Sequence, residues 1–168
     1  MLEPKAPSES EAVMTQVILP SDANPLSAAF GGRVMEWIDI CAGVAAGRHC
    51  RHAVVTASMD DLHFHTPIHV GWVVTLRARV LAAFHTSMEV GVIVHAEDIL
   101  TGGQHLATSA LLTFVALNPD GTKAAVPPLR LLTEEDREAA AGAVERRQSR
   151  LERKQSSGGW QAALHAHR

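Results

Sequence analysis

The feature that most constrains this fold is one long, nearly apolar helix followed by four strand-like segments. From residue 30 or 31 to about residue 49, apolar side chains recur with the period of an α-helix. One stripe of that helix consists of Val34, Ile38, Cys41 and Ala45. A helix that is apolar over most of its circumference is buried rather than laid on a surface. We therefore expect the rest of the chain to wrap around it.

The segments on both sides of this helix are predicted to be β-strands. Residues 13–19 precede it, and four segments rich in Val, Ile, Leu and Thr follow, at residues 54–62, 72–83, 88–99 and 106–117. No helical segment separates these four strands, so a parallel sheet of βαβ units is not expected. Alternation over residues 75–80 indicates a sheet with one packed and one wet face. We predict an α+β fold in which a curved antiparallel sheet wraps around one long central helix, with an added C-terminal helix.

The chain divides into four predicted parts. Residues 1–12 are polar and interrupted by proline, which predicts a disordered N-terminal arm. Residues 13–130 form the domain of sheet and helix. Residues 131–155 are predicted to form a C-terminal helix, with Thr133 as its N-cap and acidic residues in its first turn. Residues 156–168 begin with Ser-Ser-Gly-Gly and are predicted to be a flexible tail.

Charge and cysteine content exclude several classes of partner. A formal net charge of −3 gives no whole-protein attraction to nucleic acid or to an anionic membrane. The two cysteines, Cys41 and Cys50, make no disulfide framework and no CxxC pattern, as is typical of the reducing cytosol. The chain shows no charged leader and no run of about 18 apolar residues that would span a membrane. We therefore expect a cytoplasmic protein.

One carboxylate, Asp39, interrupts the apolar helix. No Lys or Arg lies three or four residues away on the same helix to pair with it. An unpaired carboxylate in an apolar stripe is costly and is a candidate general base or nucleophile. The alternative is a structural role, in which Asp39 meets a tertiary partner or water at an interface.

The segment before the helix carries two further candidates. Gly31 and Gly32 leave backbone N–H groups open at the positive end of the helix dipole, which suits an oxyanion such as a polarised thioester carbonyl. Asn24 lies just upstream, where its amide could orient water or a carbonyl. The alternatives are close packing of a helix end for the glycines and an ordinary turn role for Asn24 before Pro25.

Two other signals are weaker. His63, His65 and His69 lie close in sequence, but there is no HExxH pattern and their spacing is irregular, so we expect surface or interface histidines and no metal site. Cys41 lies on the apolar stripe and is expected to be a small core residue rather than a nucleophile. Cys50 directly follows His49, which gives no dyad geometry.

Several runs of sequence resemble the hot-dog-fold acyl-CoA thioesterases (acyl-CoA hydrolases). The first is SDANPLSAAFGGRVMEWIDICAGVAAGRH at residues 21–49, and the similarity continues through residues 54–74, 84–102 and 111–121. It covers roughly residues 13–155. The resemblance implies the hot-dog fold and hydrolysis of acyl-CoA to a carboxylic acid and coenzyme A in fatty acid metabolism. It also implies a homo-oligomer in which two protomers build each site, with hexamers formed as trimers of dimers.

By this resemblance, Asn24 and Asp39 fall on the family's catalytic positions and are expected to meet across the dimer interface, one from each protomer. Gly31 and Gly32 fall on a Gly-Gly pair whose amides face the thioester oxygen. Whether Asp39 activates water or attacks directly through an anhydride stays open. Ser27 departs from the glycine that many members have, so the loop carrying Asn24 is expected to be less free to adopt a positive φ.

The resemblance also assigns contacts with coenzyme A, which is part of the substrate, so that no separate cofactor is expected. The segments concerned are Ala57, Ser58, Met59 and Thr86, Ser87, Met88. The basic cluster within residues 146–154 either grips the coenzyme A phosphates, as arginine forks can, or forms a solvated helix face. Within it, Arg147 is the candidate ligand contact by similarity.

Two other functions compete with hydrolysis. A non-catalytic acyl-CoA-binding or sensing protein would keep the cleft without turnover, and the departure at Ser27 gives that alternative some weight. A hot-dog dehydratase would carry a histidine beside the helix carboxylate, and none lies in this helix before His49.

Overall fold

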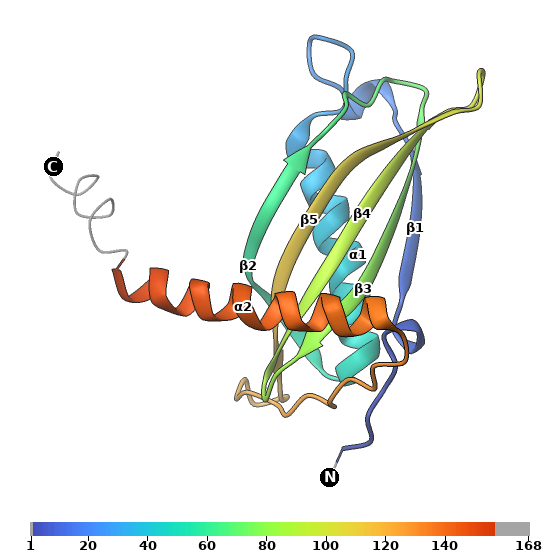
Figure 1. Ribbon diagram of the computed structural model, residues 1–168. Helices are drawn as coiled ribbons and strands as arrows, with labels where there is room; N and C mark the ends of the chain where they lie inside the picture. The colour runs from blue at the N-terminus through green and yellow to red at the C-terminus, as the bar shows by residue number, and fades with distance from the viewer. Residues whose placement is uncertain (1, 157–168) are drawn as a thin grey trace, which may run out of the picture.

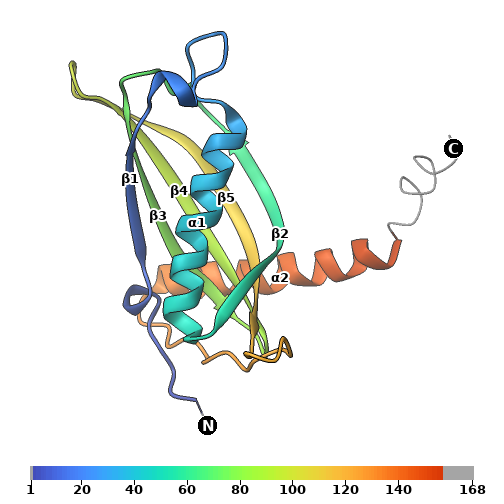
Figure 2. The same cartoon turned by 180° about the vertical axis from the view of Figure 1, so that it is seen from behind.

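The computed structural model describes residues 2–156, and its central element is the predicted long helix, α1 (Gly31–Cys50). One five-stranded sheet curves around it, formed by β1 (Ala12–Val17), β2 (Ala53–Phe64), β3 (Val73–Ala83), β4 (Ser87–Asp98) and β5 (Gly103–Leu117). The strand order is β1-β3-β4-β5-β2, and each neighbouring pair is antiparallel. The sheet holds α1 on one face, while α2 (Glu134–Ser156) crosses the opposite, outer face (Figures 1 and 2). The predicted α+β hot-dog fold is confirmed.

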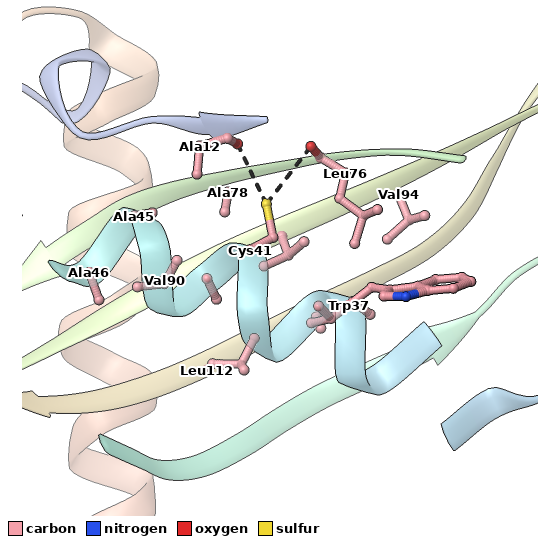
Figure 3. Close-up of a cluster of buried hydrophobic side chains, with 14 of the residues drawn as sticks. Ala12, Trp37, Cys41, Ala45, Ala46, Leu76, Ala78, Val90, Val94 and Leu112 are labelled. Atoms are coloured by element: carbon pink, nitrogen blue, oxygen red, sulfur yellow. Dashed lines mark hydrogen bonds between the residues drawn. The ribbon is translucent and has the colours of Figure 1, made fainter. Parts of the chain in front are cut away.

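The core lies between α1 and the inner face of the sheet. The predicted stripe of α1 is fully buried there, and the alternating residues Val74, Leu76, Ala78 and Val80 of β3 face it. Small side chains on both surfaces let the helix lie close to the strands (Figure 3). Cys41 is a core residue, as predicted, and its Sγ lies 3.7 Å from the Ala12 carbonyl oxygen and 3.9 Å from that of Leu76.

The residues predicted as a disordered arm are instead packed against the domain. A short 3-10 helix, η1 (Pro7–Glu9), precedes β1, and Ala6 and Ser10 are buried. The Lys5 amide donates to the Pro128 carbonyl at 3.1 Å, and the Lys5 ammonium donates to the His49 carbonyl at 2.6 Å. Polar composition was misleading here because these polar groups find partners at the C-terminal end of α1 and in the segment before α2.

Helix α2 begins as the sequence predicted. The Asp136 amide donates to the Thr133 hydroxyl at 3.1 Å, and the Thr133 amide donates to the Asp136 carboxylate at 3.2 Å, which makes a reciprocal cap. Burial alone would raise the pKa of Asp136, but the hydrogen bonds from Thr133 and Leu132 and the charge of Arg79 hold it below its usual value. The predicted flexible tail lies, apart from Ser156, outside the described residues. No helix within residues 2–156 is long and apolar enough to cross a membrane.

Candidate active site

The side chain of Asp39 lies at the open side of α1, beside the edge strand β2. It is only partly buried, and the Thr56 hydroxyl donates a hydrogen bond to its Oδ1 at 2.6 Å. No Lys or Arg side chain within residues 2–152 forms an ion pair with it. The charge is therefore held by one hydroxyl and by partial exposure to solvent rather than by a permanent cation.

Apolar side chains that face solvent surround this carboxylate. On α1 they are Met35, Ile40 and Val44, each between 39% and 49% exposed. An apolar helix face that stays exposed beside a strand edge in one protomer forms an incomplete core. Asp39 lies within this apolar surface.

Thr56 lies directly before an irregularity in β2. Thr56 pairs with Phe114, and the next paired residue, Ser58, faces Thr113, so that Ala57 is an extra residue in the strand. Thr56 pairs in regular register with the core residue Phe114, on the α1 side of the sheet, and the bulge that follows places Ser58 on the opposite face. Sequence reasoning missed Thr56 because a threonine in a β-strand is ordinary, and nothing in the sequence shows that it faces Asp39.

Asn24 and Gly31 line a second region, a pocket of about 480 Å³ at the N-terminal end of α1. The Asn24 Oδ1 accepts hydrogen bonds from the amides of Leu26 (2.9 Å) and Ala28 (3.3 Å), which fixes the loop before the helix. The Asn24 side-chain nitrogen donates to no other group within residues 2–156. It is thus a polar donor in a pocket that is mainly apolar.

Ser27, in the same loop, adopts the left-handed conformation with φ +57°. The loop therefore takes a positive φ even with serine at this position, although the sequence predicted less freedom to do so. The hydrogen bond from the Ser27 amide to the Asn24 carbonyl (3.0 Å) and the bonds at Asn24 Oδ1 hold the turn in this conformation despite the cost.

The first turn of α1 is open to a ligand. Its N-cap residue, Phe30, has no side-chain oxygen and makes no capping hydrogen bond. Gly32 is exposed, and a Cβ on Gly31 would lie 3.4 Å from the ring of Phe64 across the pocket. The amides at this helix start are therefore uncapped at the positive end of the dipole, as the sequence predicted for an oxyanion site.

Asn24 and Asp39 do not meet within one protomer. Asp39 is eight residues beyond Gly31, which corresponds to about 12 Å along the helix axis. It is absent from the residues that line the pocket containing Asn24. The structure thus brings Asn24 and Gly31 together and leaves Asp39 and Thr56 as a separate pair.

The two segments expected to contact coenzyme A, residues 57–59 and 86–88, expose their side chains to solvent to different degrees. Ala57 is exposed in the bulge, and the Ser58 hydroxyl donates to Asp60 at 3.1 Å. Met59 packs against the core. Thr86 and Ser87 lie at the turn between β3 and β4 and are partly exposed, whereas Met88 is completely buried. Met88 is thus ruled out as a side-chain contact, because it faces the core opposite Phe114.

The basic cluster of α2 divides into two groups. Arg146 and Arg150 bind the buried carboxylate of Glu89 at 2.6 and 2.7 Å, so they are neither a solvated face nor free to grip phosphate. Arg147 is exposed, and its guanidinium carbon lies 4.6 Å from the centre of the Phe84 ring. Arg147 therefore remains available to a ligand, next to the turn that carries Thr86.

The histidines and cysteines form no alternative site among the described residues. Within residues 2–156 no three His, Cys, Asp or Glu side chains gather as metal ligands. His63 and His65 stack on each other, and His65 pairs with Ser109 at 3.0 Å. Burial raises the pKa of both Cys41 and Cys50, which works against a thiolate nucleophile.

Sequence comparison places this arrangement among known proteins. Residues 26–102 match the thioesterase superfamily. An uncharacterised acyl-CoA thioester hydrolase of Bacillus subtilis, YkhA, is 41% identical over 149 residues, which are 89% of this chain and 87% of that protein. Rat acetyl-coenzyme A thioesterase is 38% identical over 142 residues, but this chain spans only 26% of its length.

Solved structures agree with the sequence comparison. A hexameric acyl-CoA thioesterase superposes with a TM-score of 0.87 at 36% identity, covering 91% of this chain and 98% of that one. The acyl-CoA hydrolase of Staphylococcus aureus, solved with butyryl coenzyme A, coenzyme A and coenzyme A disulfide, gives 0.84 at 33% identity, covering 94% and 98%. Variants of that hydrolase with an Asn, an Asp or a Thr replaced by Ala also match.

Proposed function

This chain belongs to the acyl-CoA thioester hydrolases of the thioesterase superfamily, and we propose that it cleaves acyl-CoA to a free carboxylic acid and coenzyme A, with Asp39 and Asn24 as its catalytic residues. The observation that carries this proposal is the carboxylate of Asp39, oriented by Thr56 and lying unpaired in an exposed apolar surface. The reaction needs no cofactor besides the coenzyme A of the substrate.

The S. aureus hydrolase supports this choice of residues. The Asn, Asp and Thr that were replaced by Ala in that protein follow one another at the same sequence intervals as Asn24, Asp39 and Thr56 in this chain. Thr56 thereby joins the two residues that the sequence resemblance indicated.

The site requires a second protomer. Asn24 and Asp39 lie in separate regions of one chain, and the apolar surface around Asp39 lacks a cover. A second copy docked along β2 and α1 would bury that surface and bring its own Asn24 loop to Asp39. The hexameric structural relative supports a homo-oligomer, and we propose a trimer of such dimers.

The chemistry follows from the arrangement. Asp39 either removes a proton from water or attacks the thioester carbon directly. The open amides of Gly31 and Gly32 stabilise the oxyanion, and the Asn24 amide orients the carbonyl or the water. Coenzyme A then leaves as a thiolate, which needs little acid assistance because thiols are far more acidic than alcohols.

The test is thiol release from acyl-CoA of short, medium and long chain, followed with a colorimetric thiol reagent. The wild-type protein should release coenzyme A, and Asp39→Asn should lower kcat by about a thousandfold or more while keeping its circular dichroism spectrum. Glu36→Gln, which changes an exposed carboxylate on the same helix, serves as the matched control and should remain active. A wild-type protein that binds acyl-CoA without releasing thiol would instead be a sensor.

The two-protomer site has its own test. Asp39→Asn and Asn24→Ala protomers are each inactive alone, but a mixed dimer contains one site with both residues intact. Unfolding and refolding the two variants together should restore about a quarter of wild-type activity. If the mixture stays inactive while each variant dimerises normally, both residues act within one chain.

A further inference from the structure

A cluster of four charged side chains lies on the outer face of the sheet, beneath α2. Glu89 of β4 is completely buried there. Its Oε1 accepts two hydrogen bonds from Arg146, at 2.6 and 2.9 Å, and its Oε2 accepts one from Arg150 at 2.7 Å. Arg150 also lies 3.4 Å from the carboxylate of Asp60 on β2. Two arginines thus face two carboxylates, and the cluster is electrically balanced.

Asp60 connects this cluster to the bulged part of β2. Its Oδ2 accepts the hydrogen bond from Ser58 and also faces Arg150. It lies between the two register shifts of the strand, at residues 56–58 and 60–63. The pairing of β2 with β5 is interrupted on both sides of Asp60, so the strand depends on side-chain contacts for its position there.

The bulge makes this short stretch of β2 touch both layers of the fold. In a regular strand, Thr56 and Ser58 would face the same side. Thr56 faces α1 by its regular pairing with Phe114 and meets Asp39 there, whereas the extra residue Ala57 places Ser58 on the outer face, where it meets Asp60. A displacement of the strand at Asp60 would therefore displace Thr56 on the other face.

We propose that Arg150 and Asp60 are positioning residues for Asp39: their ion pair beneath α2 fixes the bulge of β2 and so holds the Thr56 hydroxyl against the catalytic carboxylate. The side chains of Arg150 and Asp60 are 15% and 23% exposed, so solvent screens the pair less than it would a surface pair. The inference rests on the proposed function, because it assigns the network to the same carboxylate.

A role for Arg150 in holding a coenzyme A phosphate fits less well. Its guanidinium already faces the carboxylates of Glu89 and Asp60, so a phosphate would have to displace a partner that is itself negatively charged and, for Glu89, fully buried.

The test is a double-mutant cycle between Asp60 and Thr56. Asp60→Asn removes the ion pair with Arg150 but keeps an oxygen that can accept from Ser58, and it leaves Glu89 paired with both arginines. It should lower kcat by about three- to tenfold with little change in KM. In a protein that already carries Thr56→Val, Asp60→Asn should change kcat no further, because the hydrogen bond through which it acts is gone.

The matched control is Asp61→Asn, the adjacent residue. It makes the same change of charge on an exposed side chain that has no side-chain partner within residues 2–152, and asparagine tolerates the positive φ of 48° at this position. It should leave kcat unchanged. If Asp60→Asn also leaves kcat unchanged, or if its effect multiplies with that of Thr56→Val, the proposal is wrong.

The wild type, Asp60→Asn, Thr56→Val and the double variant also give a readout that does not depend on turnover. Urea unfolding should show that the effects of Asp60→Asn and Thr56→Val on the unfolding equilibrium are not additive, with about a threefold or larger coupling. Additive effects would overturn the link between the two faces even if the protein hydrolyses acyl-CoA. Coupling in a protein without turnover would refute only the proposed function.

Discussion

The hydroxyl of Thr56 donates a hydrogen bond to the carboxylate of Asp39 at 2.6 Å, joining the edge strand β2 to the middle of α1. This bond leaves the other carboxylate oxygen, Oδ2, without a partner within residues 2–152. A fixed carboxylate with one free oxygen is suited either to take a proton from water or to attack a carbonyl carbon. Thr56 therefore orients Asp39 rather than neutralising it.

Replacing Thr56 by valine should lower kcat by about tenfold or more and change KM little. Valine has nearly the same shape but cannot donate a hydrogen bond, so Asp39 becomes free to rotate. Steady-state thiol release measures both constants. The matched control is Thr113→Val, which removes a buried hydroxyl that has no partner among the described side chains. That control should be fully active, and equal losses in both variants would contradict an orienting role for Thr56.

Ser27→Gly should stabilise the protein by up to about 1 kcal/mol. The left-handed conformation costs an L-residue about 1–2 kcal/mol, and the greater freedom of glycine in the unfolded chain cancels about 0.4–1 kcal/mol of the relief. Urea denaturation gives the free energy of unfolding. The control is Ser21→Gly in the short 3-10 helix η2 (Pro20–Asp22), where φ is not positive and glycine should be neutral or destabilising. A loss of stability at Ser27 would show that its side chain contributes more than the strain costs.

Buried His49 should make the protein less stable in mild acid. Burial lowers the pKa of His49, and its hydrogen bond to the Pro127 carbonyl (2.9 Å) only partly opposes this effect. As the pH falls below about 6.5, the unfolded chain takes up a proton first. Stability is therefore unaffected above that pH, and below it should fall by up to about 1.4 kcal/mol per pH unit until the folded histidine also titrates.

His49→Gln isolates this contribution. Glutamine can still donate to the Pro127 carbonyl but does not titrate. The free energy of unfolding, measured by urea denaturation from pH 7.5 to pH 5, should depend less steeply on pH in the variant than in the wild type. An exposed histidine, His85, serves as the control through His85→Gln. Identical slopes in the wild type and His49→Gln would mean that folding leaves the pKa of His49 unchanged.

The fold was predictable because its strongest signals are long and regular. The helix expected from residue 30 or 31 to about residue 49 spans Gly31–Cys50, since its apolar period is unbroken. The strand predicted at residues 106–117 begins earlier, at Gly103. Its start was missed because Gln104 and His105 are polar and exposed, so they add nothing to the apolar pattern. The N-terminal arm was missed because the groups that bind it lie far away in the sequence.

The site was only partly predictable. Asn24, Asp39 and the two glycines could be singled out because their residue types are unusual in their local context. Thr56 could not, since its role depends on a tertiary contact with Asp39. Nor could the pairing of Glu89 with Arg146 and Arg150, which are about sixty residues away in the sequence and meet it only because α2 crosses the outer face of the sheet.

Replacing Arg147 by alanine separates a role in binding from a role in structure. Its guanidinium stacks on Phe84 and remains exposed beside Thr86, at the turn that the sequence resemblance assigned to coenzyme A. If Arg147 binds a coenzyme A phosphate, the variant should raise KM about three- to tenfold and leave kcat at saturation unchanged. Losing the exposed stack should cost only about 0.5–1 kcal/mol of stability.

Ionic strength and a second arginine make this test specific. The KM of the wild type should rise with salt concentration, and Arg147→Ala should reduce that dependence because one screened charge has been removed. Arg137→Ala removes the same charge from the same helix at a residue that pairs with Glu134, and it should change neither KM nor its salt dependence. If the two variants behave alike, the effect reflects the overall charge of α2, and Arg147 makes no specific contact with the substrate.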